Sequence, residues 1–201
     1  PVGVVDGDRI LEREEDVMEL VTGCMGEAHI SAEDDAAFYR AIFGEGDWVL
    51  ETGQKLAYEI VSNNQIDIKD GDILMQGRHG RLEKNKVDSC TITNGAQGKV
   101  RHELIVIRYQ KDGEGKEKLT TVVIKGTPGD KGTDPAYQKG DLETGASVNE
   151  MLLYRVVITG LNITAVQPLF QYHPGARRRI RSGDSLPTDG LEGDIFLLRE
   201  S

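Results

Sequence analysis

The sequence predicts a mostly β protein, with an antiparallel β sandwich or barrel-like domain, one short N-terminal helix and an extended C-terminal arm. Three observations support this fold class. From about residue 47 to 170, apolar and polar residues alternate with a period of two, which is typical of strands. Turn clusters such as "NG" and "PGDKG" interrupt this alternation at near-regular intervals. No long helical pattern separates the strands, and this excludes parallel βαβ units.

The same patterns divide the chain into residues 1–46, 47–170 and 171–201. In the first part, "SAEDDAAFYRAIFG" predicts a helix from about 32 to 43. Ser31 is placed to cap it, acidic residues fill its first turn, where the helix dipole favours them, and Gly44 ends it. Residues 10–21, "ILEREEDVMELV", fit either an amphipathic helix or a strand.

In the second part we expect a series of antiparallel strands. The candidate strands are residues 56–61, 65–69, 72–82, 89–93, 102–110, 118–126, 152–159 and 162–170.

The strand "HELIVIRYQ", residues 102–110, is apolar on both faces, which predicts a central position in its sheet. We expect it to pair with residues 118–126 through a tight reversal at Asp112-Gly113. The charged residues Arg101, Glu103 and Arg108 flank or interrupt this strand. We interpret them as a structural charge brace.

Composition limits the possible partners. The net charge of −10 and the pI near 4.9 argue against nucleic acid, because phosphate binding needs a cationic face. Cys24 and Cys90 are 66 positions apart and predict reduced thiols. No apolar run reaches the length of a membrane span, and the charged start is unlike a signal peptide.

No motif points to a catalytic residue, a metal or a cofactor. The four histidines lack zinc-ligand spacing, and "KGTPGDKGT", residues 125–133, lacks the order of a phosphate-binding loop. The acidic residues 33–35 are explained by their position in the first turn of the helix.

The C-terminal arm carries two features that predict contact with a partner. Its basic run contains Arg177, Arg178, Arg179 and Arg181, and its apolar end contains Ile195, Phe196, Leu197 and Leu198. In an acidic chain, the arginines favour docking on an acidic face of the chain itself or of a neighbouring subunit.

Four segments in order carry a resemblance to a known family: "IDIKDGDILMQGRHGRL", "TITNGAQGKVRHELIVIRY", "LTTVVIKGTPGDKGTDPAYQKGD" and "MLLYRVVITGLNITAVQPLF". This order resembles a module of tail and baseplate structural proteins from bacteriophages and prophages of Gram-positive bacteria. The resemblance covers residues 20–170. The family usually has an aspartate where this chain has Glu103, which implies that Glu103 braces Arg101 or Arg108.

The resemblance implies a virion structural protein that is made in the bacterial cytoplasm and assembled into the tail. Its expected partners are other copies of itself, with a trimer favoured, and neighbouring tail proteins. One alternative is a module that binds a host-surface glycan, with Trp48 or Tyr109 stacking on sugar rings. A weaker alternative is a glycan-cleaving enzyme, which would need two carboxylates about 5 to 10 Å apart in a cleft.

Overall fold

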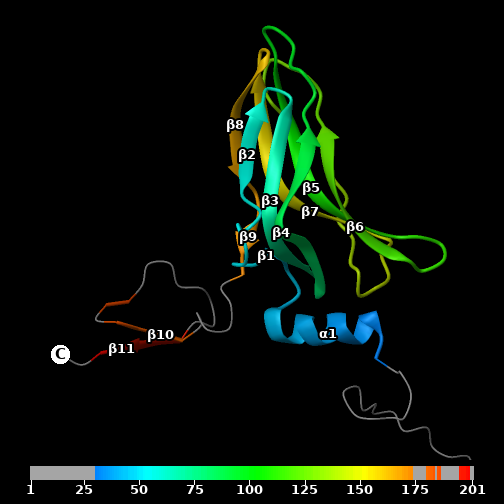
Figure 1. The fold of residues 1–201 in the computed structure, drawn as a ribbon, viewed down its shortest axis with the longest axis vertical. Coiled ribbons are helices and arrows are strands. Elements are labelled where there is room, and N and C mark those ends of the chain that lie inside the picture. The colour runs from blue at the N-terminus through cyan, green and yellow to red at the C-terminus, as the bar shows by residue number, and fades with distance from the viewer. Residues whose placement is uncertain (1–29, 174–179, 184, 187–194, 200–201) are drawn as a thin grey trace, which may run out of the picture.

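The computed structural model describes residues 30–173, 180–183, 185–186 and 195–199. In these residues, two β-sheets face each other across an apolar core, as a sandwich or half-barrel, and a single helix, α1, precedes the strands (Figure 1). This confirms the predicted fold class. The elements are α1 (Ala32–Phe43), β1 (Asp47–Val49), β2 (Tyr58–Ser62), β3 (Gln65–Met75), β4 (Arg78–Thr91), β5 (Val100–Lys111), β6 (Glu117–Lys125), β7 (Val148–Thr159), β8 (Asn162–Pro168), β9 (Gln171–Tyr172), β10 (Ile180–Gly183) and β11 (Ile195–Leu198).

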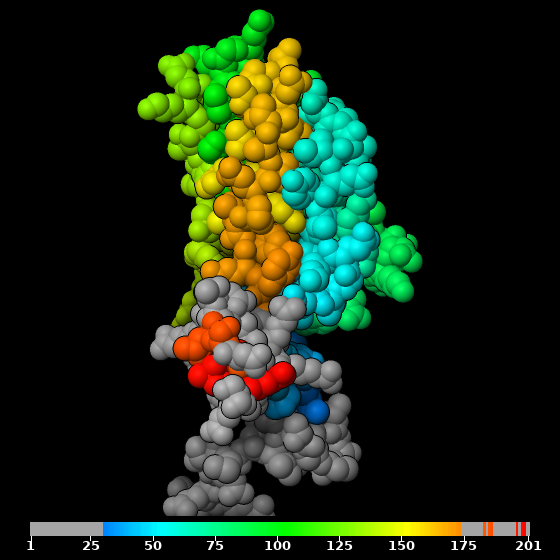
Figure 2. All heavy atoms as spheres, turned by 90° about the vertical axis from the view of Figure 1, so that its left-hand side faces the viewer, coloured from blue at the N-terminus to red at the C-terminus, as the bar shows by residue number. Residues whose placement is uncertain are grey.

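The first sheet is built around the long strand β3. It has the order β2-β3-β1-β9, and β4 pairs along the other side of β3. The second sheet has the order β6-β5-β7-β8, with all neighbours antiparallel. Figure 2 shows the side of the sandwich where β2 of the first sheet lies beside β8 of the second.

Helix α1 forms where the capping signals predicted it. Ser31 accepts a hydrogen bond from the backbone of Asp34, and the Asp34 carboxylate accepts one from the Ser31 backbone. This reciprocal capping box satisfies two amide groups that the first helical turn leaves free. Gly44 ends the helix with a positive φ of 85°.

The predicted strand 72–82 is wrong, because a two-residue turn divides it into the ends of β3 and β4. Gln76 and Gly77 both have positive φ, at 47° and 87°. Two consecutive positive φ angles are typical of the hairpin turns that match strand twist. Glutamine seldom occupies this conformation, so the sequence carried no clear turn signal.

The predicted pairing of residues 102–110 with 118–126 is confirmed by the register of β5 and β6. Ile105 and Val106 are buried, in line with the central position predicted for this strand. Ile107, Val122 and Ile124 are only half-buried. β6 is the edge strand of its sheet, so no further strand of the described part of the chain pairs with its outer side.

Residues 171–173, which we expected in the arm, instead contact the domain. Trp48 and Val49 of β1 pair in parallel with β9, and the backbone N–H of His173 donates to the Val49 carbonyl at 2.9 Å. Beyond them, β10 and β11 form a separate two-stranded parallel ribbon. The predicted element at residues 10–21 lies outside the described residues.

Among the described residues, no helix is long and apolar enough to span a bilayer.

Candidate functional site

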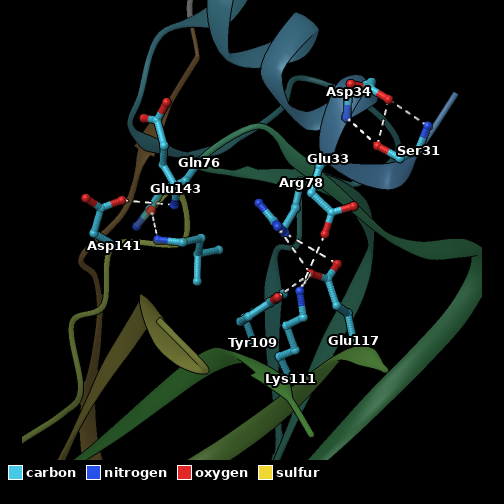
Figure 3. Close-up of polar contacts among 11 residues, drawn as sticks. Ser31, Glu33, Asp34, Gln76, Arg78, Tyr109, Lys111, Glu117, Asp141 and Glu143 are labelled. Carbon is cyan, nitrogen blue, oxygen red and sulfur yellow. Dashed lines mark hydrogen bonds and ion pairs between the residues drawn. The ribbon is translucent and has the colours of Figure 1, made fainter. Parts of the chain in front are cut away.

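A polar network under α1 is centred on Glu117, where the helix crosses one end of the sandwich (Figure 3). An open hollow of about 490 Å³ lies between α1 and the two sheets at this point. Arg78 contacts both oxygens of Glu117, with nitrogen–oxygen distances of 3.1 and 3.4 Å, and Tyr109 donates its hydroxyl to the same carboxylate. Lys111 lies 3.8 Å from Glu117 and 3.4 Å from Glu33 of the helix.

The electrostatics of this network fix the protonation state of its members. Burial opposes ionisation of Glu117, but the hydrogen bonds from Arg78 and Tyr109 outweigh it and lower the pKa of Glu117. Burial and the hydrogen bond to Glu117 raise the pKa of Tyr109 to about 12. Glu117 is therefore ionised and Tyr109 protonated at neutral pH, and the cluster links α1 to β4, β5 and β6.

The predicted glycan contact at Tyr109 is wrong. Its side chain is 2% exposed, and the Arg78 guanidinium carbon lies 5.3 Å from its ring centroid. Sugar stacking needs an open ring face, which Tyr109 does not present.

Trp48 lies in a different part of the molecule from Tyr109. Its half-buried ring packs edge-on against His173 at 5.3 Å, and His173 packs in the same way against Phe43 at 5.1 Å. A ring nitrogen of His173 lies 3.0 Å from the Phe43 carbonyl oxygen. Trp48 therefore helps to hold the end of β9 against the end of α1, and the structure does not bring it together with Tyr109.

Arg101 and Glu103 form a buried ion pair at 2.9 Å, with side chains 4% and 0% exposed. Arg101 also donates to the carbonyls of Thr93 and Asn94, which belong to the segment that crosses from β4 to β5. Burial raises the pKa of Glu103, although the neighbouring positive charge of Arg101 opposes this shift. The pair thus fastens the connection between the two sheets.

Arg108 does not join that pair. Its Nε lies 2.6 Å from Oε1 of Glu150, and Oε2 of Glu150 accepts the backbone N–H of Gln138 at 2.6 Å. Neighbouring Asn149 accepts the N–H of Gly140. The three charged residues of the predicted brace therefore hold two separate loops, one between the sheets and one between β6 and β7.

Several residues that sequence reasoning missed anchor the loop between β6 and β7. Asp134 lies 2.7 Å from the His102 ring and 2.6 Å from Nε of Arg155. Gln76 exchanges hydrogen bonds with the backbone of Gly140 and Leu142. The only sequence signal for this anchoring is the polar pair Asn149-Glu150 at the start of an apolar strand.

The buried carboxylate of Asp72 is the centre of a further polar cluster, in which His79 and Arg81 are exposed. Its carboxylate lies 2.7 Å from Nε2 of His79 and 2.6 Å from Nε of Arg81, and Thr52 donates its hydroxyl to it. Burial opposes ionisation of Asp72, but these hydrogen bonds outweigh it and lower its pKa. Within the described residues, no group of three or more His, Cys, Asp or Glu side chains could hold a metal ion.

The arm residues predicted to bind a partner are only partly described. Arg177, Arg178 and Arg179 lie outside the described residues. Arg181, Ile195 and Leu197 belong to the β10–β11 ribbon. Phe196 is half-buried and Leu198 is exposed.

Compared with protein-family descriptions and with curated proteins, the chain matches none of them.

The opposite pKa shifts of Asp72 and Glu103 predict opposite pH effects of removing their charges. A lowered folded-state pKa means that Asp72 stabilises the fold above its unfolded pKa, and that this contribution is lost as the pH falls through the folded pKa. A raised folded-state pKa means that ionised Glu103 costs stability above that pKa, and that this cost disappears as the pH falls below the unfolded value. Urea unfolding at about pH 7 and about pH 3 brackets the ordinary carboxyl pKa values.

We expect Asp72→Asn to be destabilising at neutral pH, and its deficit relative to the unsubstituted protein to shrink in acid. We expect the stability of Glu103→Gln relative to the unsubstituted protein to fall in acid. If the stability difference between each variant and the unsubstituted protein is the same at both pH values, the directions of the two pKa shifts are wrong.

Proposed function

We propose that the protein is a structural component of a bacteriophage or prophage tail or baseplate that acts by subunit assembly. The observation that carries the proposal is the exposed apolar surface of α1. Ala36 is the only buried residue of this helix, whereas Phe38 is 60% exposed and Ile42 44% exposed. Ile30 and Tyr39 add further exposed apolar surface. A surface helix normally turns such residues toward a core, so this face favours burial against another subunit.

The arm supports the same proposal. In the described part of the chain, β10 and β11 hydrogen-bond only to each other among the strands. An isolated two-stranded sheet is marginally stable in water. α1 and this ribbon lie toward the same end of the sandwich in Figure 1, and together they offer contact surface to neighbouring subunits or tail proteins. We favour a trimer of the chain as the assembling unit, in line with the family resemblance.

The polar clusters also fit a structural role. Arg101 with Glu103, and Arg108 with Glu150, join loops to strands. Asp134 does the same for the loop between β6 and β7, and Lys111 links Glu117 to Glu33 of α1. A subunit that assembles with others needs loops that are fixed in this way, because a loop that moves cannot present a constant surface to a neighbour.

The test is a double substitution, Phe38→Ser with Ile42→Ser, in the full chain. We expect the variant to associate more weakly than the unsubstituted protein in sedimentation over a hundredfold range of concentration, since mass action makes assembly concentration-dependent. Leu161→Ser is the matched control, because Leu161 is also exposed but lies in the turn between β7 and β8 at the other end of the sandwich. Equal association of the double variant and the control would reject assembly through α1.

A further inference from the structure

β2 is an edge strand that carries neither lysine nor proline, and its pairing with β3 is regular except between Ile60 and Ser62. It ends the order of its sheet, and all five of its residues are exposed. It contains Tyr58, Ile60 and Val61, and its one charged residue, Glu59, is already paired with Lys69. Figure 2 shows β2, in cyan, at the surface. An apolar edge whose single charge is already paired is a template for another strand.

The other edges of the two sheets are protected by the features that proteins commonly use. The free side of β4 carries Lys84 and Lys86 around Asn85, whose positive φ of 63° breaks the regular strand. β6 carries Lys118 and Lys125, β8 ends in Pro168, and β9 has only two residues. Lysine, proline, irregular backbone and short length all discourage strand addition.

Ile60 is an apolar side chain that this edge leaves incompletely buried. It pairs with Ile66, so both side chains lie on the same face of the sheet, and Ile66 is buried in the core. Ile60 is nevertheless 46% exposed. Within the described residues the sheet ends at β2, so none of their strands covers the outer side of Ile60, and one more strand would complete its burial.

The direction of the free main-chain groups follows from the pairing with β3. The Ala57 carbonyl accepts the N–H of Lys69. Hydrogen-bonded and non-hydrogen-bonded pairs alternate along an antiparallel ladder. The main-chain groups of Glu59 therefore point toward β3, and those of Tyr58 and Ile60 point away from the sheet.

We propose that β2 pairs antiparallel with β2 of a second copy of this chain, with Ile60 facing its own equivalent across a two-fold axis. The contact requires only a second copy, so it does not depend on the tail assignment. It is separate from the contact proposed for α1.

Three antiparallel registers would use the outward-pointing main-chain groups of Tyr58 and Ile60. The charge on Glu59 and the backbone at Leu56 favour the register in which Ile60 pairs with itself. Pairing Tyr58 with Ile60 of the second copy would place the two Glu59 carboxylates directly opposite, which is unfavourable. Pairing Tyr58 with itself would extend the ladder into Leu56, which is buried with a positive φ of 54° and does not continue the strand. Pairing Ile60 with itself sets Glu59 opposite Val61 and covers both isoleucines.

Ile60→Lys tests the contact in the full chain, with Val87→Lys as the matched control. Both residues are 46% exposed, and Val87 lies on the protected strand β4. Two lysines would face each other across the axis, so we expect self-association of Ile60→Lys to weaken about tenfold or more. Sedimentation should show no comparable change for Val87→Lys, and unchanged melting of both variants checks the fold.

Disulfide trapping gives a second measurement. In a Cys24→Ser background, the remaining thiol, Cys90, is buried and its pKa is raised to about 12, so it does not react. Directly paired residues lie about 5.5 Å apart between Cα atoms, within disulfide reach. Mild oxidation should therefore yield covalent dimers of Ile60→Cys and none of Val87→Cys.

Equal association of the two lysine variants, or no difference in dimer yield between the two cysteine variants, would overturn the pairing. Loss of association only in the Phe38→Ser, Ile42→Ser variant would support assembly through α1 and would overturn the β2 pairing, because Ile60→Lys would then associate like Val87→Lys. Loss only in Ile60→Lys would support the β2 pairing and reject assembly through α1.

Discussion

Replacing Arg101 by leucine is expected to lower the free energy of unfolding by about 3 to 5 kcal/mol, the usual cost of removing one partner from a buried ion pair. The substitution leaves the Glu103 carboxylate fully buried without its positive partner. It also removes the donor to the Thr93 and Asn94 carbonyls, and thereby loosens the connection between the sheets. Urea unfolding measures the effect.

Two comparisons define the cause of this loss. Lys99→Leu breaks an ion pair only two residues away, but Lys99 and Asp130 are solvent-exposed, so we expect a cost below about 1 kcal/mol. The double variant Arg101→Leu, Glu103→Leu should recover much of the loss, because it removes both buried charges. If the double variant is as unstable as Arg101→Leu, the uncompensated carboxylate is not the source of the effect.

Replacing Gly77 by alanine is expected to cost about 2 to 5 kcal/mol, combining backbone strain with overpacking. Gly77 has a φ of 87°, and a Cβ atom there would lie 2.0 Å from the carbonyl oxygen of Ala36. Ala36 is the buried residue of α1, so the helix or the turn between β3 and β4 must move to admit a methyl group.

Gly113→Ala is the control, because a Cβ atom there meets nothing within 4 Å. It should change stability by no more than about 0.5 kcal/mol, as for other open surface positions. Thermal and urea unfolding of both variants measure the difference. A Gly77→Ala protein as stable as Gly113→Ala would mean that α1 does not rest on this turn.

The sequence by itself predicted the elements whose signals are local. The α1 boundaries depend on Ser31, the acidic first turn and Gly44, all within the helix or next to it. The period of two and the two apolar faces of residues 102–110 predicted the strand class and the central place of β5. These features depend on how each side chain meets its nearest neighbours along the chain, which the sequence records directly.

Only the tertiary structure decided which distant groups meet. Arg108 pairs with Glu150, 42 positions away, because the register of β5 and β7 sets the two residues opposite each other. Tyr109 is buried rather than available to a sugar because Arg78, from the strand after an unpredicted turn, covers its ring. Register depends on the packing of whole strands, and a shift by one residue would turn every side chain to the other face, so no short stretch of sequence contains this information.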